Sequence, residues 1–368
     1  MINSVLVKPS GPDCNLRCNY CFYRRKAGMF EGKSHRMSAH VLETLIRDAM
    51  AMGVSTFSWQ GGEPTLMGLR FFENVVELEM RYGAPGTVVA NALQTNGTLI
   101  DRDWAKFLAE YRFLVGISID GPARLHDFYR KDAKGKDTHA RVMQAARLLR
   151  DHGVEFNVLA LVSGANVREP EAVYDFLVEN DFHYLQFVPC VEPGGRGSPA
   201  VFSITPDDYG EFLVRVFDRW ERDFPRVSIR DFDDLLLREL GRNPGTCTCS
   251  DHCADYVVVE HNGDVFACDF FVTGKWRLGN ITRTPLSEIA DSEVLKQFGR
   301  AKRELGPVCE ACEFLKSCHG GCQKHRIVLG GETTDPSYFC RAYRRLFAHA
   351  RPRMPQLAER IGRTDPSG

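Results

Sequence analysis

Hydrophobic and polar positions alternate with two different periods along roughly the first 225 residues. Short runs rich in β-branched and aromatic residues are typical of buried strands, and longer stretches between them carry the helical period. The short runs predict strands at residues 4–8, 56–60, 88–94, 114–119, 156–162 and 184–188. The longer stretches predict helices at residues 38–52, 101–111, 138–152, 169–180 and 207–223, with Ser38 and Asp101 as N-caps.

This alternation of strand and helix predicts parallel strands joined by right-handed crossovers. Six strands are too few for a closed eight-stranded barrel, so we expect an α/β fold with a partial (β/α)6 TIM-like barrel. In such a fold the active groups lie at the carboxyl ends of the strands, where the loops 61–64, 95–97 and 120–122 follow predicted strands.

The pattern changes in the last third of the chain. Nine cysteines lie between Cys247 and Cys340, with short predicted strands at 256–260 and 264–268 and few long apolar periods. A region with so little core-forming pattern is expected to depend on metal for its stability. We therefore predict a barrel domain at residues 1–230 and a smaller cysteine-rich domain with a C-terminal helix at residues 231–368.

Composition restricts the possible partners. The formal net charge of −1 gives no bulk attraction to nucleic acid or to an anionic membrane, and neither a signal peptide nor a membrane-spanning stretch is present. We therefore expect a cytoplasmic protein that binds neither nucleic acid nor membrane. The 13 cysteines are clustered, and cytosolic thiols are kept reduced, so metal ligation is favoured over disulfides.

The first cysteine cluster directly follows the first predicted strand. Cys14, Cys18 and Cys21 have the spacing C-x3-C-x2-C, which lets three thiolates hold three irons of a cubane and leaves the fourth iron open. The alternative is a zinc knuckle completed by a distant histidine.

This loop resembles the signature of the radical S-adenosylmethionine (SAM) superfamily. In that family SAM chelates the open iron and is cleaved reductively to a 5′-deoxyadenosyl radical. The resemblance continues in Gly61-Gly62-Glu63-Pro64, which is similar to the family's GGEP motif after the second strand.

The later cysteines resemble a SPASM domain, which holds two auxiliary [4Fe–4S] clusters and brings the implied total to three clusters plus SAM. The resemblance implies Cys247, Cys253, Cys268 and Cys322 as ligands of the first auxiliary cluster and Cys309, Cys312, Cys318 and Cys340 as ligands of the second. Cys190 and Cys249 are then spare, although Cys247, Cys249 and Cys253 compete for two positions. The alternative is a zinc ribbon built from C-x2-C pairs.

Shorter runs identify the chain as similar to anaerobic sulfatase-maturating enzymes. They are Cys21-Phe22-Tyr23, residues 94–101, Ser118-Ile119-Asp120-Gly121-Pro122, Arg130-Lys131-Asp132, Cys268-Asp269-Phe270 and residues 275–280. That family oxidises one cysteine or serine in a C/S-x-P-x-R sequence of a sulfatase to Cα-formylglycine. The resemblance implies SAM contacts at Tyr20, Gly62, Ser118, Arg130 and Val191.

The implied reaction needs a base for the substrate thiol, and a carboxylate can serve. Asp269 fits because it adjoins Cys268, and the following Phe270-Phe271 would reduce its solvation. The structural alternative is a surface aspartate in a turn.

The resemblance implies an unfolded or nascent sulfatase as substrate and a reduced flavodoxin- or ferredoxin-type electron donor, and we expect a monomer. Two other functions stay open. A related SPASM enzyme forms thioether or carbon–carbon crosslinks in a ribosomal peptide, and a zinc-binding scaffold would have no activity.

Overall fold

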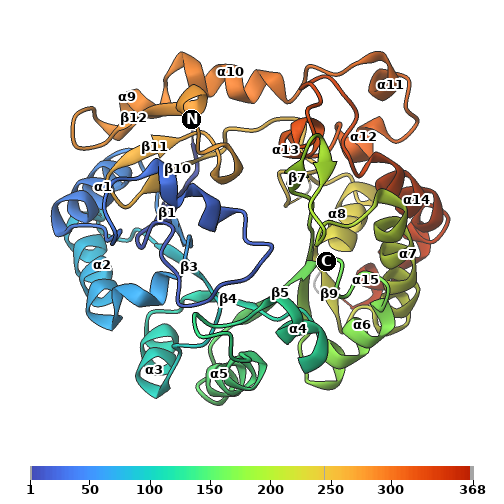
Figure 1. The fold of residues 1–368 in the computed structure, drawn as a ribbon, viewed down its shortest axis with the longest axis horizontal. Helices are drawn as coiled ribbons and strands as arrows, with labels where there is room; N and C mark the ends of the chain where they lie inside the picture. Colours follow the sequence, from blue (N-terminus) through green and yellow to red (C-terminus); the bar gives the residue numbers. More distant parts are fainter. Residues whose placement is uncertain (1, 244, 365–368) are drawn as a thin grey trace. The chain divides into compact units, whose positions relative to one another are not determined.

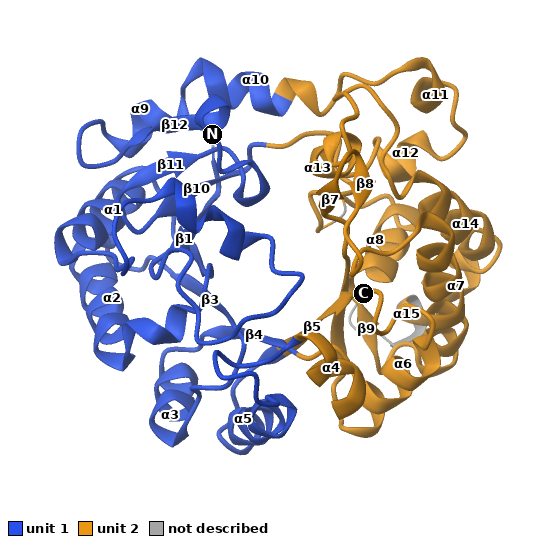
Figure 2. Ribbon diagram, viewed as in Figure 1, with its two compact units in different colours: residues 1–118, 130–156, 254–299 blue, residues 119–129, 157–253, 300–368 orange. Residues whose placement is uncertain are grey.

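The computed structural model describes residues 2–243 and 245–364, which form two compact units (Figure 2). The first unit contains residues 1–118, 130–156 and 254–299, and the second contains residues 119–129, 157–253 and 300–368. Residues 254–299 thus belong to the same unit as the N-terminal strands. The division near residue 230 that the motifs suggest stays a prediction.

The sheet of the first unit has the strand order β12-β11-β10-β1-β2-β3-β4 (Figure 1). Its strands are β1 (Ser4–Lys8), β2 (Thr56–Trp59), β3 (Ala90–Thr95), β4 (Leu114–Ser118), β10 (Tyr256–Glu260), β11 (Asp264–Phe266) and β12 (Arg277–Asn280). β1 to β4 are mutually parallel neighbours, as the alternation predicts. β10 also runs parallel to β1, whereas β11 and β12 extend the sheet in antiparallel fashion.

Helices follow the parallel strands, as expected. The first unit contains α1 (Ala39–Ala51), α2 (Leu69–Tyr82), α3 (Arg102–Glu110), α5 (His139–Asp151), α9 (Leu286–Ala290) and the short helices η1 (Tyr23–Met29), η2 (Pro64–Met67), η3 (Asp269–Phe271) and η4 (Gly274–Trp276), and α10 (Glu293–Ala301) ends just beyond it. The predicted N-caps are confirmed: Ser38 accepts from the backbone of Val41, and Asp101 accepts from two amides of α3. The expected helices omit α2, whose N-cap is Gly68 at φ 78° with no side-chain cap, so the usual start signals are missing.

A polar chain lies inside the core of this unit. Trp59 Nε1 donates to Asn91 Oδ1, and Asn91 Nδ2 donates to Glu79 Oε2 at 2.9 Å. Glu79 is only 5% exposed, and its Oε1 has no hydrogen-bond partner. Burial raises the pKa of Glu79 to about 7.

Replacing Glu79 by Gln should therefore make stability less dependent on pH. The folded protein holds the Glu79 proton more tightly than the unfolded chain does, so stability is lost as pH rises from about 4.5 through about 7. From pH 5.5 to pH 8, the free energy of unfolding of the unmodified protein should therefore fall by about 2 kcal/mol relative to that of E79Q. Anaerobic urea unfolding measures this, with exposed Glu77→Gln on the same helix as control. A constant difference across this range would contradict the prediction.

The second unit contains the parallel strands β5 (Phe156–Val162), β6 (Tyr184–Pro189) and β9 (Ser228–Ile229), and a hairpin of β7 (Pro193–Gly195) and β8 (Ser198–Pro199). Its helices are α4 (Ala123–Tyr129), α6 (Pro170–Glu179), α7 (Pro206–Asp223), α8 (Arg230–Glu239), α11 (Pro307–Glu310), α12 (Leu315–Cys318), α13 (Gln323–Ile327), α14 (Cys340–Ala350) and α15 (Met354–Thr364).

The C-terminal segment contributes more apolar packing than its pattern suggests. α14 buries Ala342, Tyr343, Leu346, Phe347 and Ala350. It packs along α7, where a Cβ at Gly210 would lie 3.2 Å from the Cα of Ala342. Packing between these helices therefore stabilises the C-terminal segment in addition to any bound metal. No helix in the described part of the chain has the length and apolar character needed to cross a bilayer.

Candidate active site

The loop after β1 carries Cys14, Cys18 and Cys21 and is fixed by backbone contacts with the loop after β2. The amides of Gly62 and Glu63 donate to the carbonyls of Gly11 and Asp13, each at 2.8 Å. A Cβ at Gly62 would lie 1.9 Å from the Asp13 carbonyl oxygen, so only glycine allows this approach. The GGEP sequence therefore positions the cysteine loop.

Glu63 connects that contact to the loop after β3. It is 1% exposed and accepts from the hydroxyl of Thr95 at 2.7 Å and from the amide of Asn96 at 2.7 Å. Asn96 in turn donates through Nδ2 to the Cys14 sulfur at 3.7 Å and to Asn15 Oδ1 at 2.9 Å. Asn96 is thus a residue around the cysteine loop to which the sequence analysis assigns no role.

The segment that carries Arg130 runs against the same loop. The amide of Arg17 donates to the Lys131 carbonyl, and the amide of Ala133 donates to the Asn15 carbonyl. The Arg130 guanidinium, in a residue 7% exposed, lies 5.5 Å from the ring centroid of Tyr20. Two of the implied SAM contacts are therefore adjacent.

Ser118 ends β4 and is buried, with 9% exposure. Its Oγ accepts from Gln94 Nε2 on β3 at 3.2 Å. An accepted hydrogen bond leaves the Ser118 hydroxyl proton available to another acceptor. Tyr20, Gly62, Ser118 and Arg130 all belong to the first unit.

Asp269 lies in η3, directly after Cys268, in this same unit. Its Oδ2 is 3.6 Å from Lys8 Nζ, and its Oδ1 is 3.6 Å from the Cys268 sulfur. The phenol of Tyr256 lies 3.3 Å from that sulfur. The carboxylate is thus held between a cysteine and a buried ammonium.

Lys8 is the second residue that the sequence analysis misses. It is 2% exposed at the carboxyl end of β1, and its Nζ lies 4.4 Å from the ring centroid of Tyr23. Tyr23 donates to Glu260 Oε1 at 2.5 Å. The available signal is a charged residue at the end of an otherwise apolar strand, which alone does not distinguish a buried lysine from an exposed one.

Within the first unit, aromatic packing joins the loop that carries Asp269 to the loop that carries Cys14, Cys18 and Cys21. The rings of Phe22 and Phe270, which follow Cys21 and Asp269, have centroids 4.9 Å apart. Lys26 Nζ donates to the Val272 carbonyl at 3.1 Å. The two cysteine-bearing loops are therefore held in one arrangement.

The remaining implied SAM contact, Val191, lies in the second unit just after β6. It is fully buried, and the adjoining Cys190 is 4% exposed. The Cys190 amide donates to the Val162 carbonyl, and its carbonyl accepts from the Ile204 amide. Cys190 is thus a small buried side chain, as expected.

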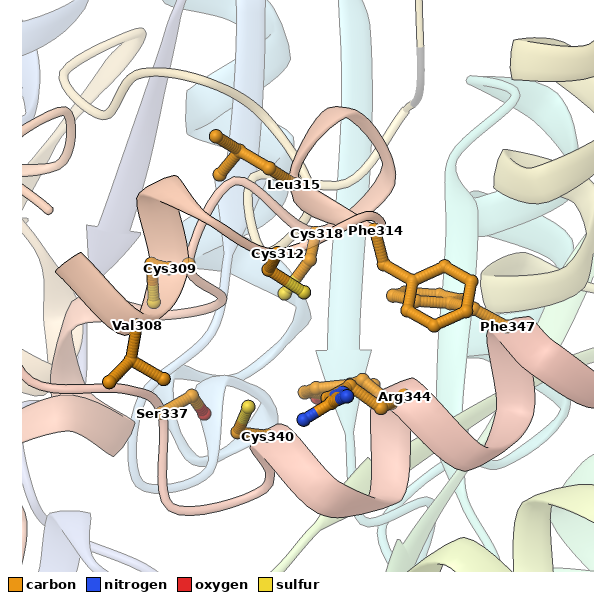
Figure 3. Close-up of a pocket in the computed structure, with 12 residues that line it drawn as sticks. Val308, Cys309, Cys312, Phe314, Leu315, Cys318, Ser337, Cys340, Arg344 and Phe347 are labelled. Carbon is orange, nitrogen blue, oxygen red and sulfur yellow. The ribbon is translucent and has the colours of Figure 1, made fainter. Parts of the chain in front are cut away.

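Four cysteines of the second unit surround one cavity, and their sulfur atoms face it (Figure 3). They are Cys309, Cys312, Cys318 and Cys340, the implied ligands of the second auxiliary cluster. Phe314, Tyr343 and Phe347 make much of its wall apolar, and Ser337 and Arg344 add polar groups to it. Within the described ranges no three His, Cys, Asp or Glu side chains converge closely enough to hold one metal ion.

The other cysteines divide less clearly. Cys253 is close to Cys322 and accepts a hydrogen bond from Gln323, whereas Cys247 is exposed. Cys249 instead interacts electrostatically with Asp231 and Cys318, and partial burial raises the pKa of its thiol to about 12. Cys268 belongs to the first unit. The structure therefore brings Cys253 and Cys322 together and leaves the choice among the three neighbouring cysteines a prediction.

Cys249→Ala should leave the iron content unchanged, whereas Cys253→Ala should lower it and destabilise the cysteine-rich segment. The reason is that Cys253 interacts electrostatically with Cys322, an implied ligand of the same cluster, whereas Cys249 interacts with Asp231 and Cys318. Iron and sulfide analysis of the two purified variants measures this, with limited proteolysis reporting the destabilisation. Loss of iron in Cys249→Ala alone would reverse the assignment.

The donor chemistry fits iron–sulfur clusters. None of the 13 cysteines, all of which lie in the described part of the chain, forms a disulfide bond. Burial raises the pKa of the Cys14 thiol to about 12 and that of Cys318 to about 11, so at neutral pH each thiol keeps its proton until a bound cation replaces it. The Cys14 sulfur also accepts from the Leu16 amide at 3.3 Å, a hydrogen bond of the kind that tunes cluster thiolates.

Comparison with known proteins agrees with this chemistry. The Radical SAM superfamily matches residues 9–177, and the SPASM iron-sulfur cluster-binding domain matches residues 249–313. The cysteine-type anaerobic sulfatase-maturating enzyme of Clostridium perfringens is 39% identical over 97% of this chain and 99% of its own. The serine-type enzyme of Bacteroides thetaiotaomicron is 40% identical over 97% of this chain and 91% of its own.

A solved structure, native anSMEcpe with bound AdoMet and Cp18Cys peptide, has a TM-score of 0.90 at 38% identity and covers 97% of this chain and 99% of that chain. This confirms the predicted α/β fold with its parallel strands, while the count of six barrel strands stays a prediction. With relatives of this similarity over nearly its full length, the chain belongs to the anaerobic sulfatase-maturating enzymes of the radical SAM superfamily.

Proposed function

We propose that this enzyme oxidises the cysteine of a sulfatase C-x-P-x-R sequence to Cα-formylglycine, with Asp269 as the base for the substrate thiol. The observation that carries the proposal is the position of the Asp269 carboxylate, which lies between buried Lys8 and Cys268. It belongs to the same unit as the loop that carries the first three cysteines. The names of its relatives support the reaction, and the peptide bound to anSMEcpe supports a polypeptide substrate.

The cofactors are iron–sulfur clusters and SAM, and we assign three [4Fe–4S] clusters. Cys14, Cys18 and Cys21 would hold the first, and SAM would contact Tyr20, Gly62, Ser118, Arg130 and Val191. The auxiliary clusters would use Cys247, Cys253, Cys268 and Cys322, and Cys309, Cys312, Cys318 and Cys340. When bound, these groups supply a 5′-deoxyadenosyl radical that takes the Cβ hydrogen and an acceptor for the electron left on that carbon.

The protein's own residues handle the proton. The substrate Cβ loses a hydrogen atom, its thiol loses a proton to Asp269, and the carbon loses one electron, which together leave a thioaldehyde. Water then replaces sulfur to give formylglycine and hydrogen sulfide. The Lys8 ammonium holds Asp269 Oδ2, so the carboxylate is already oriented when substrate arrives.

A serine at the same position is the second candidate substrate, because the serine-type relative is as similar as the cysteine-type one. We further propose a monomer that takes electrons from a reduced flavodoxin- or ferredoxin-type donor and acts on unfolded or nascent sulfatase in the cytoplasm. The net charge of −1 agrees with a protein partner rather than nucleic acid.

Anaerobic incubation with SAM, a reductant and paired peptides containing Cys-x-Pro-x-Arg or Ser-x-Pro-x-Arg tests the proposal. Mass spectrometry should find formylglycine in the cysteine peptide, together with 5′-deoxyadenosine. A peptide crosslinked through thioether or carbon–carbon bonds would identify the alternative peptide maturase. A colourless protein without absorption near ~400 nm would indicate zinc.

A further inference from the structure

Two buried cations lie beside the turn that joins Cys318 to Cys322, and all of these residues belong to the second unit. Arg326 is 3% exposed and Lys302 is 1% exposed. Three consecutive residues of the turn have left-handed backbone, namely His319 at φ 47°, Gly320 at φ 74° and Gly321 at φ 66°. Such a turn lies outside any helix or sheet ladder, so its buried carbonyls need other donors.

Arg326 and Lys302 provide those donors. Arg326 donates to the carbonyl of His319 at 3.1 Å and to that of Gly320 at 3.0 Å. Its other three N–H groups bind the backbone carbonyls of Lys302, Glu304 and Thr333. Lys302 Nζ donates to the backbone carbonyls of Thr248 and Gly321. All five guanidinium donors are thus used on neutral acceptors, which solvate the charge without cancelling it.

The electrostatic partners of these cations are cysteines. Burial lowers the pKa of Arg326, and four cysteines of the second unit oppose that shift, namely Cys253, Cys309, Cys318 and Cys322. Lys302 also interacts electrostatically with Cys318. Gly320, whose carbonyl Arg326 binds, lines the same cavity as Cys309 and Cys318 (Figure 3). The guanidinium therefore lies against the wall of that cavity.

The cavity is the implied site of the second auxiliary cluster, whose four ligands all lie in the second unit. A cubane bound by four thiolates carries a net negative charge, which increases when the cluster accepts an electron. A buried cation nearby stabilises the more negative, reduced form, because the protein interior screens charge less than water does. Arg326 and Lys302 can act in this way, since the acceptors of their hydrogen bonds are neutral.

We propose that Arg326 and Lys302 raise the reduction potential of the cluster held by Cys309, Cys312, Cys318 and Cys340, and so adapt it to accept the electron left on the substrate carbon. This inference rests on the proposed function, because it takes those four cysteines as the ligands of one cluster. Neither cation is a ligand, and each acts through its charge. The same side chains also hold the turn after Cys318, so charge and hydrogen bonding have to be separated.

Two substitutions of Arg326 separate these effects. Arg326→Gln removes the charge, while its amide can still donate to carbonyls. Arg326→Lys keeps the charge but loses the forked arrangement of donors. Lys302→Gln removes the second charge at an independent position. Arg344→Gln is the matched control, because Arg344 lines the same cavity but is exposed, so that solvent screens its charge.

The potential is measured by a redox titration followed by electron paramagnetic resonance, in full-length protein with alanine in place of Cys14, Cys18 and Cys21. Cys340→Ala in the same background identifies the signal of the second auxiliary cluster. At a fixed potential, the ratio of reduced to oxidised cluster should fall about tenfold in Arg326→Gln, which equals a shift of about −59 mV for one electron. Lys302→Gln should shift the potential in the same direction. Arg326→Lys and Arg344→Gln should stay near the unmodified value.

An unchanged potential in Arg326→Gln at full iron content would overturn the proposal, because Arg326 would then only hold the turn. An equal shift in Arg326→Lys would overturn it as well, since the charge would not be the cause. So would a shift in Arg344→Gln as large as that in Arg326→Gln, because burial would then have no role. If Arg326→Gln loses its iron, Lys302→Gln decides by the same criterion. A protein in which no signal depends on Cys340 would instead refute the ligand assignment of the proposed function.

Discussion

Replacing Cys14, Cys18 and Cys21 together by alanine should abolish SAM cleavage and leave about eight irons bound, two cubanes of four. The three thiols share one loop of the first unit, whereas the cavity lined by Cys309, Cys312, Cys318 and Cys340 lies in the second. The loop is positioned by Gly62 and Glu63 through backbone bonds that do not involve the sulfurs. The substitutions therefore remove one set of ligands and leave the surrounding fold in place.

Iron analysis and chromatography of 5′-deoxyadenosine measure this on the same anaerobic sample. The retained iron is the internal control, because it shows that the cysteine-rich segment has folded. Any 5′-deoxyadenosine above background would place SAM cleavage at another cluster. Loss of all the iron would mean that the three clusters assemble as one unit.

Local signals predict the parallel strands because each is a short run with apolar residues at its buried positions. Val5, Val7, Phe57 and Trp59 are fully buried in β1 and β2, and such residues are recognisable one strand at a time. The sequence does not predict α2, because its N-cap residue Gly68 provides no capping side chain. The pairing of β10 with β1 joins segments about 250 residues apart and has no local signature.

Some residues of the candidate site can likewise be predicted from the sequence and others cannot. The cysteine spacing and the glycine of GGEP are visible in sequence because a cluster and a close backbone approach each demand one residue type. Lys8 and Asn96 act through contacts that form only after folding, with Asp269 and with the Cys14 sulfur. Neither residue belongs to a pattern that would distinguish it from an ordinary strand end or turn.

Asp269→Asn should lower formylglycine yield by about 10²-fold or more while SAM cleavage continues. The substrate thiol has an ordinary pKa near ~8.5 and is mostly protonated at neutral pH, so a base is needed. Asparagine keeps the size and hydrogen-bonding capacity of the side chain but cannot take the proton. The Lys8 ammonium, 3.6 Å from the carboxylate, would still hold the amide oxygen and limit rearrangement.

The measurement pairs 5′-deoxyadenosine with formylglycine in the same reaction, at matched iron content. Asp291→Asn is the control, since its side chain is 81% exposed and paired with Lys296. Formylglycine at the unmodified rate would make Asp269 a turn residue and place the base elsewhere. If SAM cleavage also disappears, Asp269 supports the structure of the loop after Cys268, because its carboxylate lies beside that sulfur. Loss of product with cleavage retained is the one outcome that assigns the proton transfer to Asp269.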